Sequence, residues 1–211
     1  MTSTSPVSSA EFVFPASFAQ QRLWFLNRLA PGNPFYNVSA AIRLRGQLNI
    51  TALEQTFEEI VRRHEVLRTT FEMVEGELNQ VVGEGVNVSL PVIDLGYLPK
   101  TEREAAARQQ AIAQSQRCFD LTADLLLRVT LFQLDPGDRI LLLNLHHIIA
   151  DGWSIGILVR EIGILYTAFN AGKPSLRQAA LTPLPDLPIQ YADFALQPLP
   201  LPVGEVSVLN G

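Results

Sequence analysis

The spacing of apolar residues predicts helices in several stretches of the chain. The stretches are residues 17–29, a segment that follows Thr51, residues 101–117 and residues 153–169, with a shorter helix expected at 188–196. In these stretches apolar side chains recur every three or four positions, which places them on one face of a helix. Ser17 is expected to cap the first helix. Thr51–Glu54 and Thr101–Glu104 match the capping-box pattern that begins a helix.

Other apolar residues alternate with polar ones or run together, which predicts strands. The expected strands are residues 38–44, 66–73, 78–82, 86–93, 125–134 and 139–146. Glu75-Gly76 is expected to turn the hairpin between the second and third of these strands. Pro136-Gly137 has the residues of a tight turn and is expected to join the last two. The mixed order of helices and strands predicts an α+β fold, an α/β sandwich with helices packed on a mixed sheet.

The most apolar strand ends on two adjacent histidines, in the sequence NLHHIIADGWS at residues 144–154. RILLLNLH is apolar on both faces, so it is expected to lie in the middle of the sheet. Because side chains alternate along a strand, His146 shares a face with Leu142, and His147 shares the other face with Leu145. The two rings therefore do not act together: one is expected to face a cavity and the other the packed interior.

The residues after the histidines offer two interpretations of Asp151. It can cap the helix that begins near Trp153, or it can form an ion pair with a distant arginine and fix the loop. An exposed imidazole at this strand end can accept a proton near neutral pH, since its ordinary pKa is about 6.5. Gly152 is expected to relieve the backbone where strand turns into helix.

Other functional interpretations of the histidines are weaker. Adjacent strand histidines diverge and no third ligand is suitably spaced, so no metal site is predicted. His64 lies on the apolar face of its helix and is interpreted as a core histidine. A serine hydrolase is disfavoured because His147 comes too early in the chain for the order Ser, Asp/Glu, His that this hydrolase fold uses.

Composition narrows the class of protein. The 211 residues carry a net charge of −5 and include 47% hydrophobic residues. No basic stripe points to nucleic acid, and no apolar run is long enough for a membrane span. Cys118 is the only cysteine, so no internal disulfide is possible. The start has no secretory-signal pattern, and a cytoplasmic location is expected.

Four stretches resemble the motifs of condensation domains of nonribosomal peptide synthetases, in the expected order. NLHHIIADGWS resembles the His-His-x-x-x-Asp-Gly signature of that family. The other three are SFAQQRLWFL at 17–26, RRHEVLRTTF at 62–71 and YADFAL at 191–196. Together they extend over residues 12 to about 196. The resemblance implies a chloramphenicol-acetyltransferase-like fold, as one half of a two-lobed domain whose active site lies between the lobes.

The resemblance also implies roles for individual residues. His147 matches the catalytic histidine, His146 the supporting one, and Gly152 the glycine whose N–H lies near the thioester. Asp151 matches an aspartate that pairs with an arginine, for which Arg63 and then Arg68 are the candidates. Trp153 and Ser154, which follow in the motif, are candidate substrate-binding residues.

The family joins a carrier-bound acyl or peptidyl thioester to the amine of a carrier-bound aminoacyl thioester. No directly bound cofactor or metal is implied, because phosphopantetheine belongs to the partner carrier domains. Heterocyclisation domains carry aspartate where His146 stands, so that variant is disfavoured. An epimerisation-domain fragment, which shares the His-His signature, remains an alternative. A catalytically inactive remnant or carrier-docking module is another.

The C-terminal part departs from the family pattern. Seven prolines fall within residues 173–202, which favours a linker over a packed core. We expect a disordered leader at 1–11, an N-terminal condensation subdomain at 12–172, and a proline-rich linker and truncated tail at 173–211. A separately encoded C-terminal half is therefore an expected partner.

Overall fold

The computed structural model describes residues 12–84, 88–173 and 189–191. The strands are β1 Phe12–Pro15, β2 Asn37–Arg45, β3 Thr69–Val74, β4 Glu77–Val82, β5 Val92–Asp94, β6 Leu127–Asp135, β7 Asp138–His146 and β8 Ile189–Tyr191. The helices are α1 Phe18–Leu29, α2 Ile50–Arg63, α3 Lys100–Ser115 and α4 Gly152–Asn170. Short 3-10 turns lie at Pro34–Tyr36 (η1) and Glu65–Arg68 (η2).

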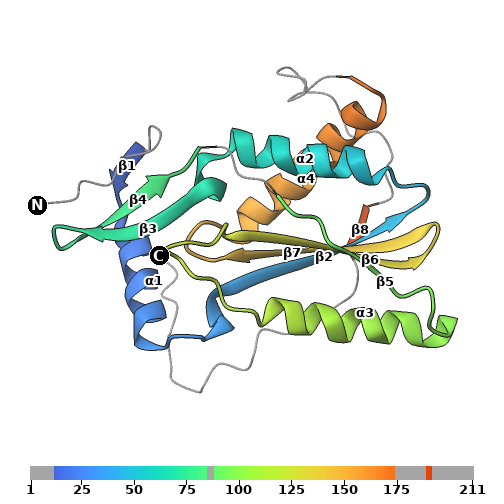
Figure 1. Cartoon of the computed structure of the whole chain (residues 1–211), viewed down its shortest axis with the longest axis horizontal. Coiled ribbons are helices and arrows are strands. Elements are labelled where there is room, and N and C mark those ends of the chain that lie inside the picture. Colours follow the sequence, from blue (N-terminus) through green and yellow to red (C-terminus); the bar gives the residue numbers. More distant parts are fainter. Residues whose placement is uncertain (1–11, 85–87, 174–188, 192–211) are drawn as a thin grey trace, which may run out of the picture.

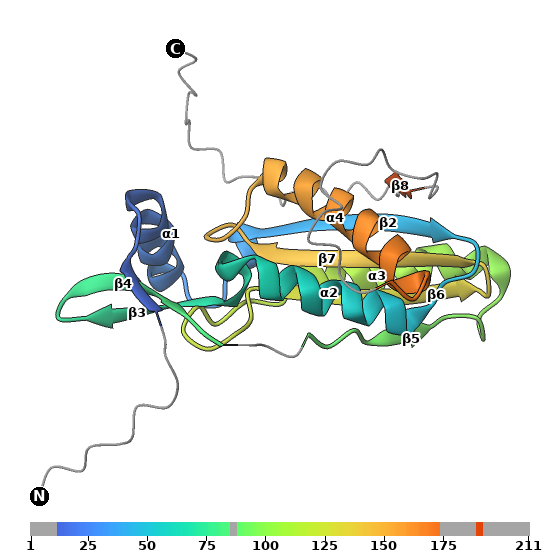
Figure 2. The same cartoon turned by 90° about the horizontal axis from the view of Figure 1, so that it is seen from above.

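A five-stranded mixed sheet in the order β5-β6-β7-β2-β8 forms the middle layer (Figure 1). β7 is antiparallel to both β6 and β2, whereas β5 runs parallel to β6. Helices α2 and α4 cover one face of this sheet and α3 covers the other (Figure 2). The predicted central position of β7 is confirmed, and so is the α+β class.

The two faces of β7 enter two separate cores, as the alternation of its side chains predicts. Leu141, Leu143 and Leu145 pack with α2 and α4. Ile140 and Leu142 pack with α3. Burying a leucine or isoleucine side chain fully contributes about 1.5–3 kcal/mol. The strand is therefore held from both sides, which gives the residues at its end a firm base.

A second, three-stranded sheet lies at the end of the molecule where β7 finishes and α4 begins (Figure 1). Its order is β1-β4-β3, and Glu75 and Gly76 form the predicted hairpin turn with positive φ angles of 52° and 87°. Helix α1 lies beside this sheet (Figure 2) and is capped by Ser17, as predicted. Trp24 is its buried residue, and its ring centroid lies 6.4 Å from that of Phe71.

Both capping boxes after the first helix were wrong predictions. Helix α2 begins at Ile50, and its cap is Asn49, whose side chain accepts a hydrogen bond from the Ala52 N–H at 3.1 Å. Helix α3 begins at Lys100 after Pro99, with no side-chain cap. Asn49 is a stronger cap than threonine, and at the start of α3 the Pro99 carbonyl accepts from the Glu102 N–H at 2.8 Å without any side-chain cap. Each threonine therefore lies inside the first turn.

Three further predictions need correction. The strand expected at 66–73 begins only at Thr69, because Glu65–Arg68 forms η2. Within the described part of 86–93, only Val92 and Ile93 belong to a strand, β5. Ile189–Tyr191 pairs with β2 as a strand, where a short helix was expected. The rest of 188–196, the predicted leader 1–11 and most of 173–211 lie outside the described residues.

Candidate functional site

The candidate site is the turn that leads from β7 into α4. β7 ends at His146, which pairs with Asn37 of β2. The pairing continues one step further, because the His147 N–H donates to the Tyr36 carbonyl at 2.7 Å. Asp151 then caps α4, which starts at Gly152. The turn is thus fixed by the sheet at one end and by a helix cap at the other.

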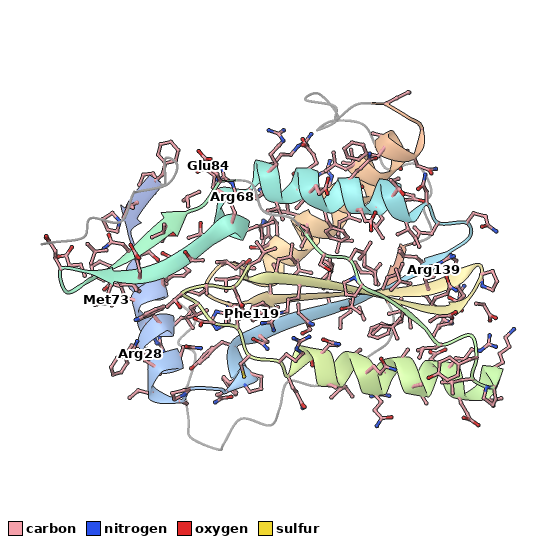
Figure 3. The ribbon with its side chains drawn as sticks, viewed as in Figure 1. Arg28, Arg68, Met73, Glu84, Phe119 and Arg139 are labelled. Atoms are coloured by element: carbon pink, nitrogen blue, oxygen red, sulfur yellow. The ribbon has the colours of Figure 1, made fainter. Side chains whose placement is uncertain are left out.

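His146 faces the interior, and its side chain is almost fully enclosed, with 2% of the residue exposed. Its ring lies between Tyr36 and Phe119, with centroid distances of 6.3 and 6.2 Å. Figure 3 places Phe119 in the loop between α3 and β6. The ring Nδ1 accepts a hydrogen bond from the Ile148 N–H at 3.1 Å. Burial, with a smaller contribution from the charge of His147, lowers the pKa of His146 to about 4.

His146 is therefore neutral at pH 7, with its proton on Nε2, since Nδ1 acts as an acceptor. A buried neutral imidazole that bonds to the turn is a structural element of the site.

His147 lies on the opposite face and is exposed. Its Nδ1 lies 2.9 Å from the Ala150 carbonyl oxygen. A carbonyl oxygen only accepts, so Nδ1 carries the proton and the lone pair of the neutral ring is on Nε2. Among the described residues Nε2 has no hydrogen-bond partner. The turn thus presents an oriented imidazole whose free nitrogen can accept a hydrogen bond or a proton.

Asp151 takes the capping role of the two that the sequence allowed. Its Oδ1 accepts from the Ser154 N–H at 2.8 Å and from the Ser154 hydroxyl at 2.6 Å. The Ser154 hydroxyl in turn accepts from the Asp151 N–H at 3.3 Å. These hydrogen bonds from Ser154 hold the pKa of Asp151 below its ordinary value. Ser154, predicted to bind substrate, uses its hydroxyl in this cap.

Within the described ranges no salt bridge joins Asp151 to Arg63 or Arg68, and that pairing stays a prediction. Arg63 Nε lies 2.6 Å from Glu59 Oε1, one turn earlier on α2. Arg68 donates to the Gly83 carbonyl and lies 3.3 Å from Glu65, next to the loop after β4 (Figure 3). Each arginine has an acidic partner three or four positions away on its own helix or turn, which is the favourable spacing.

Gly152 and Trp153 form the exposed edge of the turn. A Cβ placed on Gly152 would have no heavy atom within 4 Å, and its φ is not in the left-handed region. The expectation that glycine relieves the backbone here is therefore wrong, and the fold of the described residues does not require glycine. Trp153 is 81% exposed. The space above the first turn of α4 is open.

Sequence reasoning missed the backbone groups that orient the two rings. The carbonyls of Tyr36 and Ala150 and the N–H of Ile148 act through peptide groups, so no side-chain pattern reveals them. It also misplaced His64, which caps the end of α2. The His64 side chain is 37% exposed, and its Nε2 lies 2.6 Å from Glu161 Oε2 on α4.

Among the described residues, no group of three or more histidine, cysteine, aspartate or glutamate side chains is arranged to hold a metal ion. No described helix has the length and apolar character needed to cross a membrane.

Solved structures with the same fold include a starter condensation domain of the rhizomide synthetase RzmA. The TM-score is 0.73 at 24% identity, over 79% of this chain and 40% of that one. A complex of the X-domain and OxyB from teicoplanin biosynthesis gives a TM-score of 0.70 at 28% identity, over 83% of this chain and 36% of that one. The described part of the chain thus has the fold of a condensation domain.

The sequence places the chain within a family. A condensation-domain family model matches residues 10–197, so this chain belongs to the condensation-domain family. A linear gramicidin synthase of Brevibacillus parabrevis is 47% identical over 86% of this chain and 2% of its own length. Phosphinothricin tripeptide synthetase PhsC of Streptomyces viridochromogenes is 44% identical over 86% of this chain and 16% of its own length. The chain thus spans a small part of these curated relatives.

Proposed function

We propose that this chain supplies the N-terminal half of a condensation domain of nonribosomal peptide synthesis. The complete domain would join a carrier-bound acyl or peptidyl thioester to the amine of a carrier-bound aminoacyl thioester. The observation that carries the proposal is His147, whose Nδ1 is held by the Ala150 carbonyl at 2.9 Å while Nε2 points to no described partner. Membership of the family and its relatives among peptide-producing synthetases support the same reaction.

The chemistry suits an oriented neutral imidazole. The amine nitrogen attacks the thioester carbonyl carbon, the C–S bond breaks, and the thiol leaves as the amide forms. Nε2 of His147 accepts a hydrogen bond from the attacking amine and directs its lone pair to the carbonyl. The proton that the nitrogen loses passes to the departing sulfur. Holding the two reactants in this geometry supplies much of the rate enhancement of such a reaction.

Phosphopantetheine arms of the carriers are the proposed source of both thioesters, and the chain itself is proposed to bind no prosthetic group. A second half is needed because the structural relatives extend well beyond the matched region, which is 40% of the RzmA domain. Exposed apolar residues on α1 support this requirement: Phe18, Phe25 and Leu29 are 90%, 60% and 65% exposed. We expect the chain 1–211 alone to have little or no condensation activity.

The test mixes the chain with one donor and one acceptor carrier, each loaded with a thioester, with and without a C-terminal half from a homologous condensation domain. Product is measured by mass spectrometry. We expect amide product only with the second half, and a loss of at least 100-fold for His147→Ala, since a positioned acid–base group contributes about 10²–10⁴-fold. The melting temperature of His147→Ala should stay unchanged, because the side chain is exposed.

Product formed by the chain alone and lost on His147→Ala would contradict the half-domain proposal. Full activity of His147→Ala in the complemented domain would contradict the role of the imidazole. Carrier binding without product under every condition would instead support the carrier-docking alternative.

A further inference from the structure

A cavity of about 160 Å³ lies beside the candidate site, between η2, the end of β7 and the first two turns of α4. Its wall is mainly apolar and includes Val66, Leu145, Ile149, Ile157 and Leu158. Val66 and Ile157 are 37% and 45% exposed, so the cavity opens to the surface at these two residues. None of the roles described above uses this space.

The polar side chains of the cavity wall already have partners. His64 Nε2 lies 2.6 Å from Glu161 Oε2, and the Ser154 hydroxyl donates to Asp151 at 2.6 Å. A charged group entering the cavity would lose its water and meet no unpaired opposite charge on the described lining residues. The lining therefore favours an uncharged, apolar occupant.

Two features connect the cavity to His147. Leu145 and His147 point to the same side of the extended chain at the end of β7. They are two residues apart, so their Cα atoms are about 7 Å apart at the rise of an extended chain. Ala150 lines the cavity, and its carbonyl oxygen holds His147 Nδ1. A substrate whose carbonyl or amine lies at His147 therefore needs only a few bonds to reach the cavity with its side chain.

We propose that this cavity binds the side chain of one of the thioester substrates, and that it selects an uncharged group of branched aliphatic or single-ring size. An apolar protein cavity of about 150 Å³ accommodates benzene, so a volume of about 160 Å³ suits a leucine-sized or phenyl group. The proposal rests on the proposed function for the identity of the ligand. It adds the chemical class of substrate that the function leaves open.

The test measures binding to the chain 1–211 by NMR titration of its methyl groups. The probes are stable amide analogues of aminoacyl-pantetheine that carry glycine, leucine or aspartate, each with an acetylated or a free amine. We expect the leucine probes to bind at least tenfold more tightly than the glycine probes, because each buried methylene is worth about fourfold in affinity. Aspartate should bind no better than glycine, and shifts should centre on Val66, Ile157 and Leu158.

Matched variants decide whether the preference arises in this cavity. Val66→Phe fills the mouth and should abolish the leucine preference, as should Ile157→Trp. Val74→Phe is the control, because Val74 on β3 is 40% exposed, close to the 37% of Val66, and does not line the cavity. Comparison of acetylated with free-amine leucine probes identifies whether the donor or the acceptor substrate supplies the side chain.

Equal affinity for leucine and glycine probes would overturn the proposal, as would a Val66→Phe variant that behaves like Val74→Phe. Absence of methyl shifts around the cavity with every probe would also overturn it. His147→Ala should keep the leucine preference while it abolishes condensation in the complemented domain. Failure of the cavity proposal is therefore distinguishable from failure of the proposed function.

Discussion

The main sheet and the open end of the molecule differ in how far their apolar side chains are buried. By open end we mean α1, the three-stranded sheet and residues 147–153. Along β7 every residue from Arg139 to His146 is buried. At the open end Phe18 and Trp153 are 90% and 81% exposed. Large exposed apolar surfaces are uncommon on monomers and often mark interaction sites. The centre of the main sheet is therefore covered within this chain, whereas the open end is suited to contact another part.

The largest expected effect is on stability, and it compares the same substitution, phenylalanine to alanine, at a buried and at an exposed helix position. Phe57 on α2 is fully buried against the main sheet, and Phe25 on α1 is 60% exposed. We expect Phe57→Ala to lower the free energy of unfolding by about 3–5 kcal/mol, because it leaves a cavity in a packed core. Phe25→Ala should change it by less than about 0.5 kcal/mol. Urea denaturation of both variants measures the contrast, and equal losses would show that α1 packs more tightly than its exposure indicates.

The second-largest expected effect is the pH dependence of the folding stability, which arises from the buried His146. Because burial lowers the pKa of His146 from 6.5 to about 4, the unfolded chain binds the proton more readily than the folded chain between these values. His146 therefore gives its full contribution to stability above pH 6.5. That contribution falls by on the order of 3 kcal/mol as the pH drops from 6.5 to 4.

Chemical denaturation at a series of pH values measures this slope in the wild type and in His146→Asn, which should lack it. His147→Gln is the control. It should keep most of the slope, since burial is the larger cause of the shift and the charge of His147 the smaller. A wild-type stability that is flat over this range would refute a buried neutral His146.

A smaller effect separates the two roles considered for Asp151. As a helix cap its side chain needs only an oxygen that accepts from the Ser154 N–H, so Asp151→Asn should keep the melting temperature within a degree or two. Asp151→Ala should lower it by several degrees, because the cap is lost. Thermal unfolding followed by circular dichroism measures both. A loss as large in Asp151→Asn as in Asp151→Ala would point to an ion pair after all.

The smallest effect is expected at Gly152. Since an added Cβ meets no atom within 4 Å, Gly152→Ala should change the free energy of unfolding by less than about 0.5 kcal/mol. In the complemented domain the same variant should reduce product formation if the space above the turn belongs to the thioester. Parallel unfolding and condensation measurements test this separation, and a strongly destabilised variant would contradict the open geometry.

The parts of the fold that depend on side-chain periodicity could be predicted from the sequence. The alternation in RILLLNLH correctly placed Leu141 and Leu142 on opposite faces of a central strand. It also separated His146 from His147, because the two-residue period of a strand extends through both. Periodicity is reliable here since the apolar run is long and both faces are covered.

Two kinds of feature could not be predicted: which of several neighbouring polar residues caps a helix, and which backbone groups bond to the histidine rings. Thr51 matched a capping box, but Asn49 lies two residues earlier and takes the cap. Asp151 had two possible roles in the sequence, and the structure shows the capping one, in which Asp151 accepts from the Ser154 N–H in the same turn. The Ala150 carbonyl that orients His147 has no sequence signal, since every residue has such an oxygen.

The two hydrogen bonds of the turn also determine how protons move at this site. His146 accepts at Nδ1 from Ile148 and His147 donates from Nδ1 to Ala150, so the neighbouring rings are opposite tautomers on opposite faces of the strand. No relay can connect them through these nitrogens. Nε2 of His147 can therefore exchange a proton only with a group outside the turn, and in the proposed reaction it acts on the amine without any contribution from His146.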